Sequence, residues 1–277
     1  FILKCEPEII IHLAAQPIVR NSYDFPIETY DTNIMGTVNI LEAARKSKSL
    51  KAFLNVTTDK CYENKEISRG YREDEPMGGH DPYSSSKGCS ELITSAYRRS
   101  FYKDKKINLA SARGGNVIGG GDWSNDRLVP DILRSFESNK PLIIRNPQSI
   151  RPWQHVLDVL SGYLLLTQKL YENDDKFSSA WNFGPNYEDS KSVKWIVEYM
   201  NNKWQKAPGW LEDETTNPHE ANSLKLDISK ARENLGWEPI WNLEQSLEKV
   251  IEWHKHWLAR KDIQNICEQH INIYSKF

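Results

Sequence analysis

Short apolar runs alternate with segments of helical periodicity through the first 113 residues. Three continuous apolar runs predict buried strands, at Glu8–Leu13, Ala52–Val56 and Ile107–Ala112. After a loop predicted over residues 14–25, apolar side chains recur at three- and four-residue steps from Pro26 onward, which predicts an amphipathic helix. A second helix is expected to begin after Asp81-Pro82.

This order of strands and helices predicts an α/β fold, with a doubly wound, Rossmann-like parallel sheet. Beyond residue 113 the alternation of strands and helices is less regular. The sequence predicts a helix at Leu128–Ser138, an extended segment at Pro141–Arg151, a helix at Val156–Leu170 and a short strand at Trp181–Gly184. We expect residues 1–113 and about 153–184 to form the sheet domain. Residues from about 114 to 152 and from 185 to 277 are expected to form a smaller, mostly helical domain.

The composition excludes several classes of protein. A net charge of −2 gives no reason to expect binding to nucleic acid or to an anionic membrane. No apolar run reaches the eighteen or so residues of a membrane span. The four cysteines have neither paired spacing nor a Cys-x-x-Cys motif, which predicts free thiols in a reducing cytoplasm and no metal site.

Polar or glycine-rich segments follow each of the three predicted strands, at Ala14-Ala15-Gln16, Thr57–Lys60 and Arg113–Asn116. The carboxyl ends of parallel strands meet at one edge of a sheet, and ligands bind along that edge. We therefore expect these three segments to surround one site.

Tyr83 and Lys87 lie four residues apart, so a helix would place both on one face. An ammonium beside a phenol favours its ionised form, which lets the tyrosine take a proton from an alcohol. Asp59 and Lys60 supply a second acid/base couple. A chain with both couples could oxidise an alcohol and then change the product further.

The chain resembles the extended short-chain dehydrogenase/reductase family, and within it the CDP-glucose 4,6-dehydratases. The resemblance is carried by His12-Leu13-Ala14-Ala15-Gln16-Pro17, Thr32-Asn33-Ile34-Met35-Gly36-Thr37, Thr58-Asp59-Lys60, Tyr83-x-x-x-Lys87, Arg113-Gly114-Gly115-Asn116 and Arg151-Pro152-Trp153-Gln154-His155. These segments occur in the family's order, and with Gly119–Trp123, Asp126–Pro130 and Leu235-Gly236-Trp237 the resemblance extends over the chain from about Glu8 to Trp257.

The resemblance implies a lyase that uses bound NAD to convert CDP-glucose to a 4-keto-6-deoxy sugar. Tyr83 would remove the proton of the sugar 4-hydroxyl, with Lys87 holding the nicotinamide ribose and Thr58 bonding the sugar nearby. Asp59 would protonate the departing 6-hydroxyl. A turn-capping role for Asp59 is the structural alternative.

Lys60 stands where the deoxythymidine-linked relatives carry a glutamate, and the CDP-glucose enzymes resemble this chain in having lysine. A neutral Lys60 would act as the base at carbon 5. A charged Lys60 would instead stabilise the enolate and leave another group as the base. We favour a direct catalytic role and leave both forms open.

By position in the family pattern, the cofactor would be contacted by Leu13, Ala14, Ala15, Gln16, Thr32, Tyr83 and Lys87. The nucleotide sugar would be contacted by Asn116, Arg127, Leu128, Leu142, Ile144, Arg151 and His219. Arg151 suits the diphosphate because a guanidinium binds phosphate with two donors, although a structural ion pair is the alternative. The family likeness also implies a homodimer.

The glycine fingerprint Gly-x-x-Gly-x-x-Gly is absent from the 277 residues. In the family it lies on the first strand–helix turn, where it holds the pyrophosphate. We therefore expect a truncated chain whose sheet lacks its N-terminal strands, starting at Phe1 without methionine. Two alternatives remain: a nucleotide-sugar 4-epimerase, and an inactive, truncated nucleotide-binding protein.

Overall fold

The computed structural model describes residues 1–172, 175–215 and 221–276. The chain divides into two compact units, each built from separate stretches of sequence. Unit 1 comprises Phe1–Gly114, Ser161–Phe183 and Leu226–Glu238, and unit 2 comprises Gly115–Leu160, Gly184–Lys225 and Pro239–Phe277.

Unit 1 contains a parallel sheet of four strands in the order β1-β2-β3-β7. The strands are β1 (Ile9–His12), β2 (Ala52–Thr58), β3 (Asn108–Gly114) and β7 (Ala180–Phe183). Residues of β2 pair directly with β3, for example Thr57 with Arg113. The predicted α/β class, the parallel sheet and its strands are confirmed.

The helices of unit 1 include two long ones that follow the predicted segments. They are α1 (Ile2–Cys5), α2 (Val19–Asp24), α3 (Pro26–Tyr30), α4 (Gly36–Arg45), α5 (Pro82–Tyr97) and, from Ser161 on, α7 (Val156–Tyr171). Short 3₁₀ turns are η2 (Asp59–Cys61), η4 (Lys103–Lys105) and η5 (Asp175–Phe177), and η3 (Arg98–Tyr102) and η7 (Ala231–Leu235) are π-helical. A π-helical segment, η1 (Asp31–Met35), joins α3 to α4.

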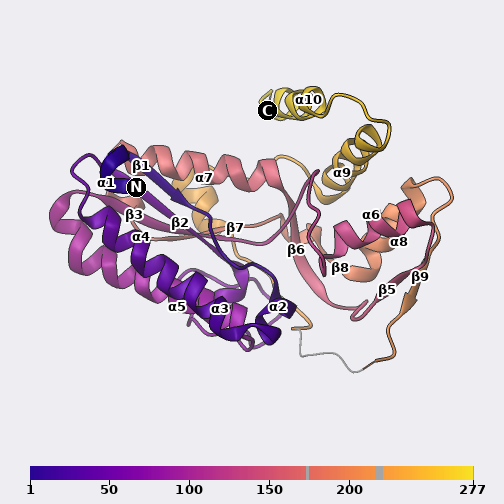
Figure 1. Ribbon diagram of the computed structural model, residues 1–277, viewed down its shortest axis with the longest axis horizontal. Helices are drawn as coiled ribbons and strands as arrows, with labels where there is room; N and C mark the ends of the chain where they lie inside the picture. Colours follow the sequence, from indigo (N-terminus) through magenta and orange to yellow (C-terminus); the bar gives the residue numbers. More distant parts are fainter. Residues whose placement is uncertain (173–174, 216–220, 277) are drawn as a thin grey trace. The chain divides into compact units, whose positions relative to one another are not determined.

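The alternation of side chains along β3 directs successive residues to opposite faces of the sheet. Ser111 and Arg113 contact Glu91 of α5, whereas the Asn108 side chain donates to the Leu170 carbonyl oxygen of α7 at 2.8 Å. Helices α4 and α5 thus lie on one face and α7 on the other (Figure 1). Burial on both faces explains why apolar residues are not confined to alternate positions of these strands, and why polar residues such as Ser111 and Arg113 are hydrogen-bonded.

The loop predicted over residues 14–25 is wrong in part, because it contains the short helix α2. The residues of α2 mostly have low helix propensity and show no apolar periodicity, so this helix could not be predicted from the sequence. The Ser22 hydroxyl donates to the Val19 carbonyl oxygen at 2.6 Å, and α2 packs against α5. Tertiary contacts therefore stabilise a helix that propensity disfavours.

Unit 2 combines helices with two small sheets. One sheet contains β4 (Asn116–Ile118), β6 (Ile150–His155) and β8 (Ser190–Ser192), and the other contains β5 (Leu142–Ile144) and β9 (Trp210–Glu212). The helices are α6 (Leu128–Ser138), α8 (Val193–Lys203), α9 (Leu243–Leu258) and α10 (Ile263–Tyr274), with a short turn η6 (Tyr187–Asp189). Side chains of α6, α8, α9 and the strands form one hydrophobic core.

The two units differ from the predicted domain limits in two segments. Residues 226–238 belong to unit 1, since Leu226 bridges to Tyr71 and the Trp237 ring packs edge-on against Phe183 at 5.0 Å. Residues 153–160 belong to unit 2, where β6 pairs with β4. Among the described residues, every helix is too short or too polar to cross a membrane.

Candidate active site

Helix α5 begins with a well-formed cap that fixes where its catalytic candidates lie. Asp81 accepts a hydrogen bond from the Ser84 amide at 2.8 Å. Pro82 occupies the first turn, where a backbone N–H would have no acceptor within the helix, so proline causes no loss of a hydrogen bond there. Tyr83 and Lys87 follow one turn apart on one face, and each is only 7% exposed. The helix predicted for this pair is thus observed.

The Lys87 ammonium group lies between helix α5 and strand β2. Its Nζ donates to the Val56 carbonyl oxygen at 3.3 Å. Burial lowers the pKa of Lys87 to about 8, and the nearby Glu91 carboxylate opposes this shift. The amine therefore exchanges its proton much closer to neutral pH than an exposed lysine does.

Thr58, Asp59 and Lys60 form a compact turn at the carboxyl end of β2. The Thr58 hydroxyl donates to Asp59 Oδ1 at 3.0 Å, and Lys60 Nζ lies 3.4 Å from the same oxygen. Asp59 is fully buried, and its Oδ2 accepts no hydrogen bond from the residues that the structure describes. A buried oxygen without a hydrogen-bond partner is unusual in a folded protein and marks Asp59 as a candidate functional residue.

The two halves of the predicted site lie in the same neighbourhood. Helix α5 packs against the Asp59–Cys61 turn, and a β-carbon at Gly88 would lie only 3.3 Å from the Cys61 carbonyl oxygen. Burial raises the pKa of Tyr163, and the charges of both Tyr83 and Asp59 raise it further. Tyr163 thus lies within electrostatic reach of both groups.

Asn33 ties the loop after β1 to helix α5. Its Oδ1 accepts from the Gln16 amide at 2.8 Å, and its Nδ2 donates to the Gln16 carbonyl oxygen at 3.1 Å and to Ser86 Oγ at 2.9 Å. Asn33 is 2% exposed and lies in the π-helical segment η1. Its role is structural: it fixes the loop beside Lys87.

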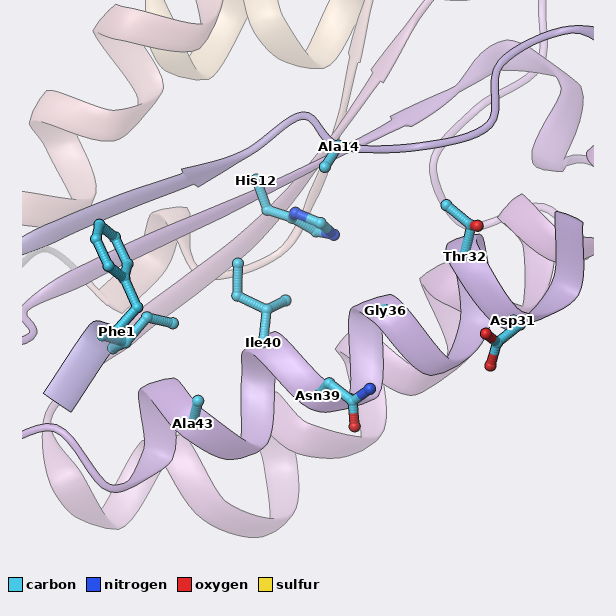
Figure 2. A pocket seen from close by; sticks show the side chains of 10 residues that line it. Phe1, His12, Ala14, Asp31, Thr32, Gly36, Asn39, Ile40 and Ala43 are labelled. Atoms are coloured by element: carbon cyan, nitrogen blue, oxygen red, sulfur yellow. The ribbon is translucent and has the colours of Figure 1, made fainter. Parts of the chain in front are cut away.

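A cavity of about 630 Å³ opens between the end of β1 and helix α4. Figure 2 shows His12 pointing from β1 into this cavity, with Ala14 just after the strand and Thr32 on the helical side near Asp31 and Gly36. The pKa of His12 lies below its usual range because the ring is buried and because the Lys87 charge repels a second proton. One residue that lines the cavity, His12, thus lies within electrostatic reach of Lys87.

This cavity and the Lys87 ammonium fit part of a dinucleotide. Ala14 and Thr32 line the cavity, and Leu13 is 54% exposed beside them, whereas Ala15 is half-buried. The Gln16 side chain is engaged elsewhere, since its Nε2 donates to Thr29 Oγ1 at 2.8 Å and its Oε1 accepts from the Ile18 amide. A ribose and its base fit the open residues, and no glycine fingerprint accompanies them in the chain.

Three substrate candidates lie near the start of unit 2. Asn116 opens β4 and is half-buried, and Leu128 is the first residue of α6. Arg127 caps α6 and forms an ion pair with Asp122, with 3.3 Å between Nη1 and Oδ2. The Arg127 side chain is 38% exposed, so its guanidinium is open to solvent.

The other candidates of unit 2 have structural contacts. Leu142 and Ile144 are buried in its hydrophobic core. Arg151 donates to the carbonyl oxygens of Ile150 at 2.9 Å, Asn222 at 3.4 Å and Ala221 at 2.5 Å. These bonds hold the segment after residue 220 against β6. His219 lies outside the described residues.

Comparison with known proteins identifies the family of the chain. The model of the family described as GDP-mannose 4,6 dehydratase matches residues 1–250. The chain belongs to this family. It is 54% identical over 278 residues to the CDP-glucose 4,6-dehydratase of Salmonella typhimurium strain LT2, covering 99% of this chain and 77% of that relative.

Solved structures share the fold of this family member. The dTDP-glucose 4,6-dehydratase of Bacillus anthracis with NAD has a TM-score of 0.75 and 24% identity, covering 92% of this chain and 74% of that chain. The UDP-glucose 4-epimerase of Thermotoga maritima with UDP-glucose has a TM-score of 0.76 and 23% identity, covering 91% and 78%. Dehydratases and epimerases thus have one fold, and only site chemistry separates them.

Sequence reasoning missed one acidic residue beside the catalytic pair. Glu91 is 4% exposed and follows Lys87 at the same four-residue step that separates Lys87 from Tyr83. That spacing was a usable signal, because three ionisable residues at i, i+4 and i+8 share one helix face. His12 could not be found this way, since its exposure to the cavity depends on α4.

We expect Lys87 to titrate near pH 8 in the folded chain, whereas exposed lysines titrate near their usual 10.5. Nuclear magnetic resonance of ¹³Cε-labelled lysine, with the Lys87 signal assigned by Lys87→Met, measures this midpoint. Lys51 is the matched control, because the Glu8 carboxylate raises its pKa above the usual value. A Lys87 midpoint near that of exposed lysines would contradict the burial of its charge.

Proposed function

We propose that the chain carries the catalytic groups of a CDP-glucose 4,6-dehydratase. The observation that carries the proposal is Asp59, a fully buried carboxyl group whose Oδ2 has no hydrogen-bond partner among the described residues, beside Lys60 and the helix of Tyr83 and Lys87. The high identity to a CDP-glucose 4,6-dehydratase supports the choice of substrate. When bound, NAD would take up the hydride from carbon 4 and return it to carbon 6 after water has left.

Tyr83 acts in the first step as the base for the sugar 4-hydroxyl. A phenol hidden from solvent loses its proton readily only when a cation stabilises the phenolate, and Lys87 is the cation one turn away on the same helix. Lys87 also has N–H donors for the nicotinamide ribose, since Val56 engages only one of them. Thr58 offers its hydroxyl to the sugar at the same place.

Asp59 acts in the second step, in which water is lost. Once carbon 4 is a ketone, the hydrogen on carbon 5 becomes acidic, and its removal allows the 6-hydroxyl to depart as water. In this proposal Asp59, as the protonated carboxylic acid, would give its proton to the departing 6-hydroxyl. Thr58 and Lys60, both bonded to Oδ1, keep the carboxylate oriented.

Lys60 has the position for a role at carbon 5. Its side chain is 25% exposed and its Nζ contacts the Asp59 carboxylate, so it stands between the buried acid and the solvent. As the amine it would take the proton from carbon 5. As the ammonium it would stabilise the enolate that forms when another base takes it.

The alternative is a nucleotide-sugar 4-epimerase. An epimerase also needs the tyrosine–lysine pair and shares this fold. It eliminates no water and so requires no acid beside the sugar 6-position. A buried Asp59 in this position would have no chemical role in an epimerase, which favours the dehydratase.

Unit 2 would bind the nucleotide part of the substrate. Arg127 presents a partly exposed guanidinium, and Asn116 and Leu128 stand at the starts of neighbouring elements in the chain. Arg151 shapes this region through its carbonyl contacts. The four cysteines are free thiols, which fits our assignment of the enzyme to the reducing cytoplasm.

With CDP-glucose and NAD, the holoenzyme should form a 4-keto-6-deoxy sugar, which absorbs in alkali. Tyr83→Phe should lower the rate by about a thousandfold, since the base is lost while the fold is kept. Tyr97→Phe on the same helix is the matched control. Formation of CDP-galactose without keto sugar would identify an epimerase and refute the dehydratase.

Lys60→Ala should separate the two steps. We expect solvent deuterium to stop entering at carbon 5, whereas hydride transfer from carbon 4 in a single turnover continues, because Tyr83 and Lys87 are intact. Mass spectrometry of the product and the absorbance of the reduced cofactor measure the two events. Undiminished deuterium entry would show that Lys60 is not the base.

A homodimer should form through helices α3–α4 and α5, which carry exposed apolar side chains. Ile27 is 83% exposed, Leu92 is 59% exposed and Met35 is 45% exposed. Leu92→Glu should convert the dimer to a monomer in analytical ultracentrifugation, because it places a charge in the interface. Leu211→Glu, on an equally exposed leucine of unit 2, should leave the dimer intact. A monomeric wild type would refute the assembly.

A further inference from the structure

Lys87 and Glu91 are successive members of one buried face of helix α5. They lie at i and i+4 and are 7% and 4% exposed. Lys87 Nζ contacts the Val56 carbonyl oxygen, and Glu91 Oε1 accepts from the hydroxyl of the next residue, Thr57, at 2.5 Å. Two side chains one turn apart thus bind consecutive residues of β2, which fixes the register of the helix on the strand.

Glu91 also binds the neighbouring strand. Its Oε2 accepts from Ser111 Oγ at 2.7 Å and from Arg113 Nη2 at 2.9 Å. Burial raises the pKa of Glu91, but the Arg113 charge and the three hydrogen bonds outweigh burial and hold the pKa below its usual range. Glu91 is therefore a carboxylate at neutral pH although it is almost fully buried.

Arg113 extends the network to the turn that carries Asp59. Its Nη1 donates to the Tyr62 hydroxyl at 2.7 Å and to the Glu73 carbonyl oxygen at 3.0 Å. Tyr62 follows the Asp59–Cys61 turn directly and donates to Asn182 Oδ1 at 2.7 Å. The ion pair between Glu91 and Arg113 thus joins the helix of Lys87 to the turn of Asp59.

We propose that Glu91 is a positioning residue of the reaction, the buried counter-charge that keeps Lys87 cationic and in register against β2. The inference rests on the proposed function, in which Lys87 stabilises the phenolate of Tyr83. It adds a residue that touches neither sugar nor cofactor and acts through Lys87.

The electrostatic part follows from the groups that face Lys87. These are Glu91 on its own helix, Cys61 on the turn after β2 and His12 on β1. Burial disfavours the ammonium, and a protonated His12 would disfavour it further. Cys61 is buried, and burial raises the pKa of its thiol well above the usual value, so it carries no charge at neutral pH. Among Glu91, Cys61 and His12, Glu91 is therefore the group whose charge stabilises the protonated form of Lys87.

Glu91→Gln tests the proposal because glutamine keeps the shape and loses the charge. The Lys87 midpoint, measured by resonance of ¹³Cε-labelled lysine, should fall by about one pH unit or more below its wild-type value. In the holoenzyme, kcat at pH 8 should fall roughly tenfold, with a much smaller change in KM, because substrate contacts remain. The alkaline limb of kcat/KM should move in the same direction as the Lys87 midpoint.

Ser111→Ala is the matched control, since it removes one hydrogen bond to Glu91 and leaves its charge. It should lower the melting temperature and leave the Lys87 midpoint in place. Glu91→Asp restores the charge and should restore the midpoint in part. If Glu91→Gln does not fold because Arg113 is left unpaired, Glu91→Gln with Arg113→Met removes that cation and should show the same fall in the midpoint.

An unchanged Lys87 midpoint in a folded Glu91→Gln or double variant would overturn the proposal, since Glu91 would then be only a structural ion-pair partner. The titration requires no turnover. A holoenzyme that forms no keto sugar would therefore refute the proposed function while the role of Glu91 toward Lys87 is still decided.

Discussion

A lysine ammonium buried between a helix and a parallel strand is the interaction on which the site depends. Lys87 reaches the backbone of β2 only because α5 lies very close to that strand, and Gly88 permits this approach beside Cys61 and Gly78. The Asp81 cap fixes where the helix begins. The position of Tyr83 relative to the end of β2 follows from these contacts.

Burial of a charge is unfavourable unless an opposite charge and hydrogen bonds accompany it. Unit 1 meets this requirement with a chain of polar side chains beneath the site rather than with a single ion pair. Glu91 receives hydrogen bonds from Thr57, Ser111 and Arg113, and Arg113 in turn reaches Tyr62. A polar network of this kind is stable only when nearly every member is satisfied, so it also specifies a unique arrangement of α5, β2 and β3.

The sequence was most informative where periodicity and chemistry coincide. Continuous apolar runs located β1, β2 and β3, and the step from Tyr83 to Lys87 located both a helix and its reactive face. It was least informative where tertiary contacts decide. Helix α2 has no local signal, Gln16 turns away toward Thr29, and the guanidinium of Arg151 bonds to backbone carbonyl oxygens. The partners of the Arg151 guanidinium are set by the three-dimensional arrangement of residues 150 and 221–222, which the spacing of residues in the sequence does not predict.

The π-helical segment Asp31–Met35 has a consequence for the evolution of this helix. A π turn corresponds to one residue inserted into an α-helix. Deleting one residue there would restore a regular helix and rotate everything on its N-terminal side by about 100°. Thr29 would then leave Gln16, and the loop after β1 would lose a contact that fixes it. Changes in length are thus forbidden inside this helix, although surface loops elsewhere in such folds accept them readily.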